Sequence, residues 1–480
     1  MNNINVLINQ PAAEKVLDPK ICLAWVIEVN TAYREVHRPG EQAQDIVNLK
    51  LCVSFWRSRL LDRLLNRPPA WAALQQDYVL LILCAINIHL SPDQQRLAGV
   101  LLNAAGLAEL LANQGIASDD YPEFNHAAGP GVDLDIVANR GSSAPYKKWR
   151  ENESFGRYQF EEEGVRFRGV SFRPGDVLLA NVNVDGNGVY TALSEPRSFS
   201  SHSGFFAIFE HDGKRLPVVV ETFEKGVRPV PLSIFLGPRF SSYVEIYRHT
   251  DYTPEHAPGS NHSAAGFIDS VLAYNFNSEE LDPRYMSCTA IGRSMHEAVK
   301  LKPAQRKSEL GHAQVQSNLA KLGFHHFDYF GPVDFLLNDC FEFVGSVDNN
   351  QVEHLLAREL IDQEFKKQFS GNSLIPEKFP FPYKINLWGV RQMRKRSLLG
   401  RLISRLEGFT ADTLPKGPDE LLAVILLLEK QTGKAIALTR STVAKVLEEL
   451  EQLDMDAFML DARIQHAVQT NLKLPWLQSA

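Results

Sequence analysis

Three residues of the chain, His202, Glu221 and Cys288, have the chemistry of a thiol-dependent acyl-transfer site. A cysteine thiolate is a strong nucleophile, and an imidazole beside it can take up its proton. A carboxylate beside the imidazole can fix its tautomer and stabilise its charged form. Such a set would act on an amide or ester through an acyl-enzyme, provided that the elements around the three residues bring them together.

His202 and Glu221 lie on two segments that predict a β-hairpin. Residues 201–209 are rich in β-forming side chains, an Asp-Gly turn follows, and residues 216–223 resemble the return strand. If the turn centres on that dipeptide, Glu221 faces Gly204. Because side chains on a strand alternate between the two faces, His202 and Glu221 would then be diagonal neighbours on one face.

Cys288 stands at the start of a segment with helical spacing of its apolar residues, 288–299, and Ser287 is a plausible N-cap. In the first turn of a helix the unpaired N–H groups and the macrodipole favour a thiolate. The same amides are candidates for oxyanion donors. A serine nucleophile at Ser201 or Ser203 is the weaker prediction, because neither lies in a nucleophile-elbow pattern.

Four segments between Phe172 and Val299 follow one another in a recognisable order: Pro174–Leu179, Ser201–Gly204, Val219–Glu221 (with Gly226–Val227 and Pro231–Leu232 behind it), and Tyr274–Phe276. In this order they resemble the circularly permuted branch of the NlpC/P60 papain-like fold, the YiiX/YaeF type, in which histidine and its polar partner precede the cysteine. The resemblance implies catalytic roles for Cys288, His202 and Glu221. It also implies a cysteine hydrolase or acyltransferase (amidase, peptidase or lipid acyl-hydrolase) with a peptide-like or lipid substrate.

A second interpretation is a non-catalytic interaction or scaffold protein. Met286-Ser287 before Cys288 and Thr289-Ala290 after it are not the residues usual in that family. A single cysteine on a helix is most often a buried small hydrophobe. In this interpretation a degenerate papain-like domain carries helical arms that bind a protein partner, whose identity the sequence does not give.

Composition narrows the class of protein. The chain has 480 residues, 44% hydrophobic and 22% charged, which is enough for two or three ordinary globular domains. Its formal charge of −7 argues against nucleic acid as a partner. Its five cysteines are sparse and odd in number, which indicates reduced thiols. No cofactor is expected, and no metal either, because the histidines lack ligand spacing (His249, His256, His262, His325, His326).

We therefore expect an α+β protein in which a papain-like, permuted NlpC/P60 β-sheet domain is flanked by helical regions. The expected boundaries are a helical domain at 1–128, a linker at 129–154, the papain-like domain at 155–330 and a helical region at 331–480. Strands should concentrate between about 155 and 260.

Residues 1–20 lack the pattern of a Sec signal peptide, and the longest apolar stretch, 78–90, is too short to span a bilayer. The protein is expected to be made in the cytoplasm, with export by a signal-less secretion system left open. Residues 391–405 form a basic amphipathic segment suited to peripheral membrane contact. The favoured interpretation is a solvated face, with its charge balanced by acidic residues (Glu448, Glu449, Glu451).

Overall fold

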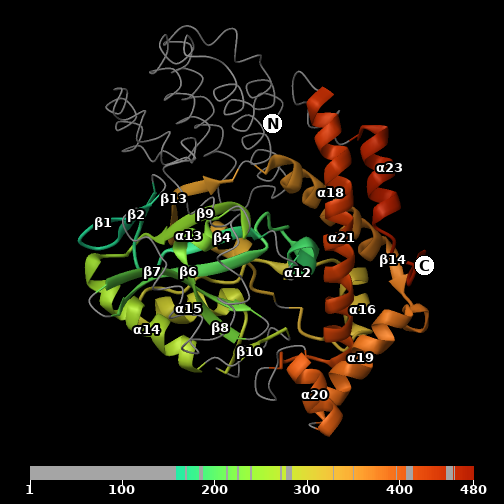
Figure 1. Ribbon diagram of the computed structural model, residues 1–480, viewed down its shortest axis with the longest axis horizontal. Coiled ribbons are helices and arrows are strands. Elements are labelled where there is room, and N and C mark those ends of the chain that lie inside the picture. Colours follow the sequence, from blue (N-terminus) through green and yellow to red (C-terminus); the bar gives the residue numbers. More distant parts are fainter. Residues whose placement is uncertain are drawn as a thin grey trace.

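A computed structural model of the protein is shown in Figure 1. It describes residues 158–480 apart from the short segments 168–169, 183–187, 212–213, 224–225, 238–239, 271–272, 277–283, 328, 350, 396, 407–413, 450–457, 459 and 480. The helical domain predicted for 1–128 and the linker predicted for 129–154 lie outside the described residues, as do Cys22, Cys52 and Cys84.

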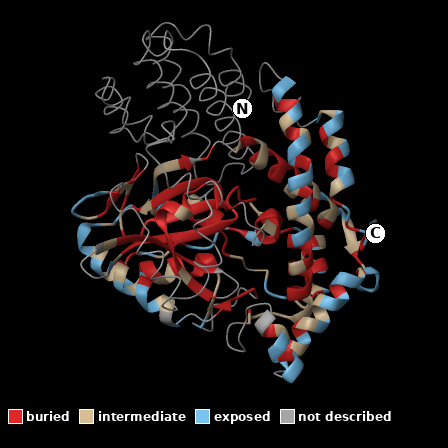
Figure 2. Ribbon diagram, in the orientation of Figure 1, coloured by how far each residue is buried: buried red, intermediate tan, exposed pale blue. Residues whose placement is uncertain are grey.

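The described chain is α+β, as predicted, and its centre is a six-stranded sheet in which all neighbouring strands run antiparallel. In spatial order the strands are β13 (Phe341–Asp348), β9 (Ser241–His249), β4 (Val177–Val182), β6 (His202–His211), β7 (Lys214–Phe223) and β8 (Gly226–Pro231). The sheet is mostly buried and lies at the middle of the molecule in Figure 2. It provides the rigid platform on which the candidate site is built.

Strands β6 and β7 form the predicted hairpin in the predicted register. Gly204 pairs with Glu221, and the ladder runs from there to His211 and Lys214. The register follows from the buried alternation of the two strands, since a slip of one residue would turn every apolar side chain to the wrong face. His202 and Glu221 therefore share one face of the sheet.

Both faces of the sheet are covered. On one face, Phe206 and Ile208 pack with residues of α13 (Leu232–Phe235) and of a small second sheet. That second sheet consists of β1 (Gln159–Phe160), β2 (Val165–Phe167) and β3 (Val170–Phe172). On the other face, Phe205 and Ala207 pack with α14 (Ala257–Ser270) and α15 (Cys288–Ala298). The alternation along β6 thus decides which side chains meet the helix that carries Cys288.

A second body of helices stands beside the sheet and is visible at the right of Figure 1. It contains α16 (Ala313–Ala320), α18 (Val352–Gly371), α19 (Phe381–Arg394), α20 (Leu398–Leu406), α21 (Asp419–Glu449) and α23 (Ala462–Asn471). The long helices α18 and α21 pack on each other, and α12 (Gly188–Leu193) packs between them and the sheet. Buried side chains of these helices form one apolar cluster that also includes Tyr274, Phe276 and Cys288.

The segment 331–480 is not helical throughout. Strand β13 belongs to the central sheet, where Phe341 pairs with His249 and Val347 with Val244 on β9. Phe341 and Phe343 pack on the α15 side of the sheet and Val347 packs on the opposite side, with a shift of register between Phe343 and Gly345. The expected strands between about 155 and 260 are present as β1–β9, so β13 is an addition to that prediction.

The remaining elements are short. They are β5 (Ser194–Glu195) with β12 (Glu309–Leu310), β10 (Ala273–Tyr274) with β11 (Tyr285–Met286), β14 (Asn372–Leu374) with β15 (Leu477–Ser479), α17 (Pro332–Leu337), and the 3₁₀ turns Pro254–His256 and Pro376–Lys378. A buried ion pair between Arg197 and Glu359 and a hydrogen bond of 2.7 Å from Arg358 to the Val182 carbonyl fasten α18 to the end of the sheet. The helical body is therefore attached next to the end of β6 that carries His202.

Candidate active site

His202 is the first residue of β6, and its imidazole is completely buried. Its Nε2 lies 2.8 Å from Oε2 of Glu221, so the two side chains meet as the hairpin register predicted. Gly204 lies between them on the same face and has no side chain to separate them. A Cβ at Gly204 would lie 2.3 Å from Cγ1 of Val219, which shows how closely the backbone is packed here.

Glu221 is held as a buried carboxylate by two partners. One oxygen bonds to His202, and the other accepts a hydrogen bond of 2.7 Å from Nε of Arg228, its cross-strand neighbour on β8. Burial alone would raise the pKa of Glu221, but the charge of Arg228 and the His202 hydrogen bond outweigh it and lower that pKa. Arg228 was not predicted, although its place follows from pairing β8 with β7.

Cys288 begins α15, as predicted, and Ser287 caps the helix by accepting a hydrogen bond from the Ala290 amide. The sulfur is buried, with the side chain 5% exposed. Burial by itself would raise the pKa of the thiol. The hydrogen bond and charge of His202, with a smaller contribution from Ser203, reverse this effect and lower the pKa of Cys288.

The imidazole of His202 therefore lies between Cys288 and Glu221, as predicted. Burial opposes its protonation, but hydrogen bonds to Cys288 and Glu221 and their negative charges raise the pKa of His202 to about 9. Because Nε2 is engaged with Glu221, Nδ1 is the nitrogen left to share a proton with the sulfur. The raised pKa of the imidazole and the lowered pKa of the thiol both favour the thiolate–imidazolium pair over the neutral pair.

Two buried hydroxyl groups lie on the face of the hairpin that Phe205 presents to α15. Ser203 on β6 and Thr222 on β7 are neighbours across the hairpin register, and both are completely buried. The backbone N–H and hydroxyl of Ser203 both favour the thiolate form of Cys288. Apart from this thiolate, neither hydroxyl has a hydrogen-bond partner among the described residues. Such groups are costly to bury, so this pair is suited to bind charge that develops during a reaction.

Tyrosine rings surround the sulfur from the side of the helical body. The hydroxyl of Tyr274 lies 3.8 Å from Sγ of Cys288. Tyr274 is brought there because β10 pairs in parallel with β11, which leads directly into α15. Burial and the charge of Cys288 raise the pKa of both Tyr274 and Tyr329, so these phenols remain neutral. Tyr274 belongs to one of the segments that carried the resemblance, but its contact with the sulfur was not predicted.

His249, His296 and Cys340 make their contacts outside the candidate site. His249 bonds through Nε2 to the carbonyl of Lys302, and His296 bonds through Nε2 to that of Gly175, whereas the buried Nδ1 of His296 has no hydrogen-bond partner among the described residues. Among the described residues no cluster of His, Cys, Asp and Glu side chains could hold a metal ion. Cys340 precedes β13 and bonds through its carbonyl to the amide of Thr250, and burial raises the pKa of its thiol.

No protein-family model, curated protein or solved structure matches this chain. The chemistry of the site is therefore inferred from its own geometry and electrostatics. These bring together all three residues that the sequence singled out, and they add Arg228, Ser203, Thr222 and Tyr274.

Proposed function

We propose that the protein is a thiol-dependent hydrolase or acyltransferase that acts on an amide or ester bond through Cys288, His202 and Glu221. The observation that carries this proposal is the lowered pKa of a cysteine at a helix start beside an imidazole whose pKa is raised to about 9. A structural cysteine in an apolar core would have a raised pKa instead. Strongly perturbed titratable groups in mutual contact are typical of catalytic sites.

In the first half of the proposed reaction, the thiolate of Cys288 attacks the acyl carbonyl and forms a C–S bond. The carbonyl π electrons move to oxygen, and N–H groups at the start of α15 together with the Ser203 and Thr222 hydroxyls stabilise that oxyanion. The imidazolium of His202 then protonates the departing amine or alcohol, and the C–N or C–O bond breaks. The products of this half are a thioester on Cys288 and a free leaving group.

In the second half, neutral His202 takes a proton from water or from an acceptor alcohol or amine, which attacks the thioester. The C–S bond breaks, and the thiolate and imidazolium are restored. Glu221 fixes the His202 tautomer in both halves, and Arg228 keeps Glu221 ionised. Water as acceptor gives a hydrolase, and another acceptor gives an acyltransferase.

We also propose that the region around the site is a permuted papain-like domain of the NlpC/P60 type. Support comes from chain order: the hairpin with histidine and carboxylate precedes the helix with cysteine, and that helix packs on β6, the strand that His202 begins. In this proposal the substrate is a peptide-like amide or a lipid ester.

The test is a panel of p-nitrophenyl esters, phospholipids and N-acyl peptides, combined with intact-mass detection of the acyl-enzyme. Cys288→Ala is expected to abolish both turnover and the acyl adduct. His202→Ala should cost about a hundredfold or more, and Glu221→Gln less, because an amide oxygen still accepts the imidazole N–H. Cys340→Ala is the matched control and should retain activity. Wild-type activity in Cys288→Ala would place the nucleophile elsewhere.

One observation favours a non-catalytic protein instead: the Cys288 side chain is only 5% exposed, and His202 is fully buried. A substrate carbonyl must reach the sulfur, so catalysis requires that Tyr274 and the neighbouring helical body move aside. Labelling by a small thiol reagent at neutral pH distinguishes the two candidates. Fast labelling of Cys288 relative to Cys340 supports an enzyme, whereas a Cys288 that resists the reagent until the protein unfolds supports a scaffold.

A further inference from the structure

Helix α19 exposes three large apolar side chains on one face. Phe381, Ile385 and Trp388 are 73%, 50% and 50% exposed, respectively. Their spacing of four and three residues places them in one row along the helix. On the opposite side, Tyr383, Val390 and Met393 are buried against the rest of the protein. The exposed row is therefore a second apolar face, additional to the one that the fold uses.

Helix α20 repeats this pattern. Leu398, Leu399 and Leu402 are 90%, 45% and 55% exposed, whereas Ile403 packs against the apolar cluster of the helical body. The two helices contact each other and form the lower right corner of the molecule in Figures 1 and 2. We call the six exposed side chains on them the α19–α20 face (Phe381, Ile385, Trp388, Leu398, Leu399, Leu402). A cluster of this kind on a protein surface marks an interaction site.

The chain segment that carries this face has charged residues of one sign only. Between Lys378 and Leu406 the chain carries eight Lys and Arg residues and no Asp or Glu, although the whole chain has a formal charge of −7. Arg391 and Arg394 pair with Glu420 and Asp419 at the start of α21, and so fasten α19 to the body.

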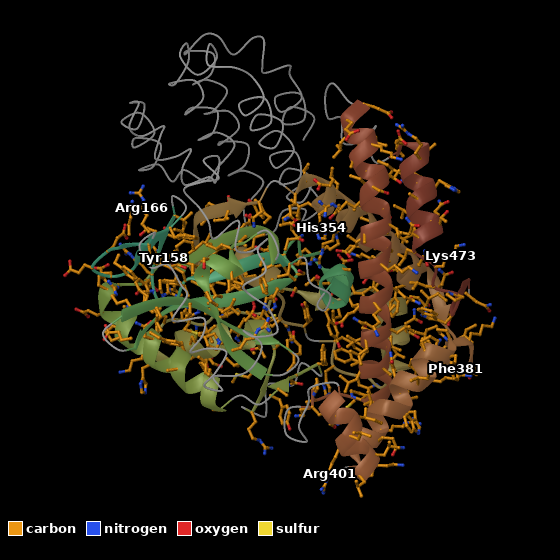
Figure 3. The ribbon with its side chains drawn as sticks, in the orientation of Figure 1. Tyr158, Arg166, His354, Phe381, Arg401 and Lys473 are labelled. Atoms are coloured by element: carbon orange, nitrogen blue, oxygen red, sulfur yellow. The ribbon has the colours of Figure 1, made fainter. Side chains whose placement is uncertain are left out.

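Three further cations, Lys384, Lys395 and Arg401, are exposed and form no ion pair with a described carboxylate. Arg401, on α20, projects from the lower tip of the molecule, and Phe381 is the first residue of α19 (Figure 3). Of the acidic residues expected to balance this charge (Glu448, Glu449, Glu451), Glu449 pairs with Arg463 instead, and Glu451 lies outside the described residues.

We propose that the α19–α20 face docks on an anionic membrane surface. Exposed apolar side chains, including a tryptophan, on a segment that also exposes lysine and arginine match the boundary between lipid headgroups and acyl chains. No described helix is long and apolar enough to cross a membrane, so the contact is peripheral.

Two other occupants fit less well. A second copy of the chain would bring these unpaired cations against one another, at an electrostatic cost. A nucleic acid would use the cations but leave the six apolar side chains in water. The proposal stands independently of the proposed catalytic function.

Flotation of the full chain with vesicles tests the docking. Wild-type protein is expected to float with vesicles of phosphatidylcholine and phosphatidylglycerol in equal parts, and much less with phosphatidylcholine alone. The double variant Leu398→Ser, Leu402→Ser should lose about tenfold or more in partitioning, because both side chains leave the lipid. The triple variant Lys384→Gln, Lys395→Gln, Arg401→Gln should lose the preference for the anionic vesicles.

The matched control is the double variant Leu438→Ser, Leu460→Ser, which removes leucines that are 49% and 77% exposed on other helices. It should partition like the wild type, and circular dichroism should show that all the variants are folded. Failure of the wild type to float with anionic vesicles would overturn the proposal, and so would an equal loss in the control. A wild-type dimer that Leu398→Ser, Leu402→Ser converts to a monomer, without vesicle binding, would identify a second copy as the occupant and also overturn it.

Discussion

Substitution of His202 by glutamine tests the electrostatic reasoning at the site without any knowledge of the substrate. Cys288 and Glu221, acting against burial, raise the pKa of His202 from 6.5 to about 9. This rise corresponds to about 3 kcal/mol in favour of the imidazolium. Glutamine keeps a hydrogen-bonding group at position 202 but cannot carry the positive charge. In His202→Gln the thiol therefore loses the interactions that lower its pKa most strongly.

The expected magnitude follows from what remains around the sulfur. A thiol at its ordinary pKa of 9.0 is about 1% ionised at pH 7. Without the imidazolium, burial raises the thiol pKa and exceeds the smaller effect of Ser203. At pH 7 the thiolate fraction of Cys288 should thus exceed that of an ordinary thiol in the wild type and fall below about 1% in His202→Gln.

Thiolate absorbance at 240 nm is the measurement, because it does not require a reagent to reach the buried sulfur. The difference between wild type and Cys288→Ser isolates the band of Cys288 from the other cysteines. We expect this band at neutral pH in the wild type and only in alkali in His202→Gln. Cys340→Ser is the control and should leave the neutral band unchanged, since the pKa of Cys340 is raised. A Cys288 band that first forms at pH 9 or above in the wild type, or that is unaffected by His202→Gln, would refute the reasoning.

The pH dependence of folding stability is a poorer test of the Cys288–His202 pair, because the contributions of the two residues change with pH in opposite directions. The raised pKa of His202 contributes stability below pH 6.5 that is lost as the pH rises through about 9. The lowered pKa of Cys288 contributes stability above pH 9.0 that is lost as the pH falls through its lowered value. Where the folded pair is a thiolate and an imidazolium, and the unfolded pair is a thiol and a neutral imidazole, both states bind one proton. The two effects therefore compensate near neutral pH.

Three more substitutions test the surroundings of the site. Ser203→Ala removes a donor to the sulfur and the oxyanion and should lower kcat about a hundredfold with little change in KM, as measured on an ester that the wild type cleaves; an unchanged kcat would remove Ser203 from the mechanism. Gly292→Ala places a Cβ 1.7 Å from Cζ of Phe205 and should cost about 1–3 kcal/mol in urea unfolding; an unchanged unfolding midpoint would contradict this close packing. Arg228→Gln leaves Glu221 buried without its cation and should cost about 3 kcal/mol at pH 7. The lowered pKa of Glu221 contributes stability that is lost as the pH falls through that pKa. The cost of Arg228→Gln should therefore be smaller in acid than at pH 7. An equal cost in acid and at pH 7 would argue against the ion pair.

Local patterns in the sequence determined the elements that carry the candidate site. The Asp-Gly dipeptide in the sequence and the alternation on either side of it predict the β6–β7 register, because a shifted register would expose the buried face. The spacing of apolar residues after Ser287 likewise specifies that Cys288 begins a helix. Both features depend on residues close together in the chain, where propensity and periodicity act directly.

Tertiary structure alone decided which distant groups join these elements. Arg228 meets Glu221 through the pairing of a third strand, and Tyr274 meets the sulfur through a two-residue parallel bridge that is too short to leave a pattern. Strand β13 adds an edge to the sheet from within a segment expected to be helical. These contacts depend on packing between remote segments, which no local period encodes.

The same distinction applies to the α19–α20 face and to the pKa values at the site. The sequence shows a basic amphipathic segment, but only packing shows that Arg391 and Arg394 pair with carboxylates at the start of α21, and that leucines of the segment stay exposed. Likewise, the sequence supplies a thiol, an imidazole and a carboxylate, each with an ordinary pKa. The lowered pKa of Cys288 and the raised pKa of His202 arise because folding buries the groups in contact, where water no longer screens their charges.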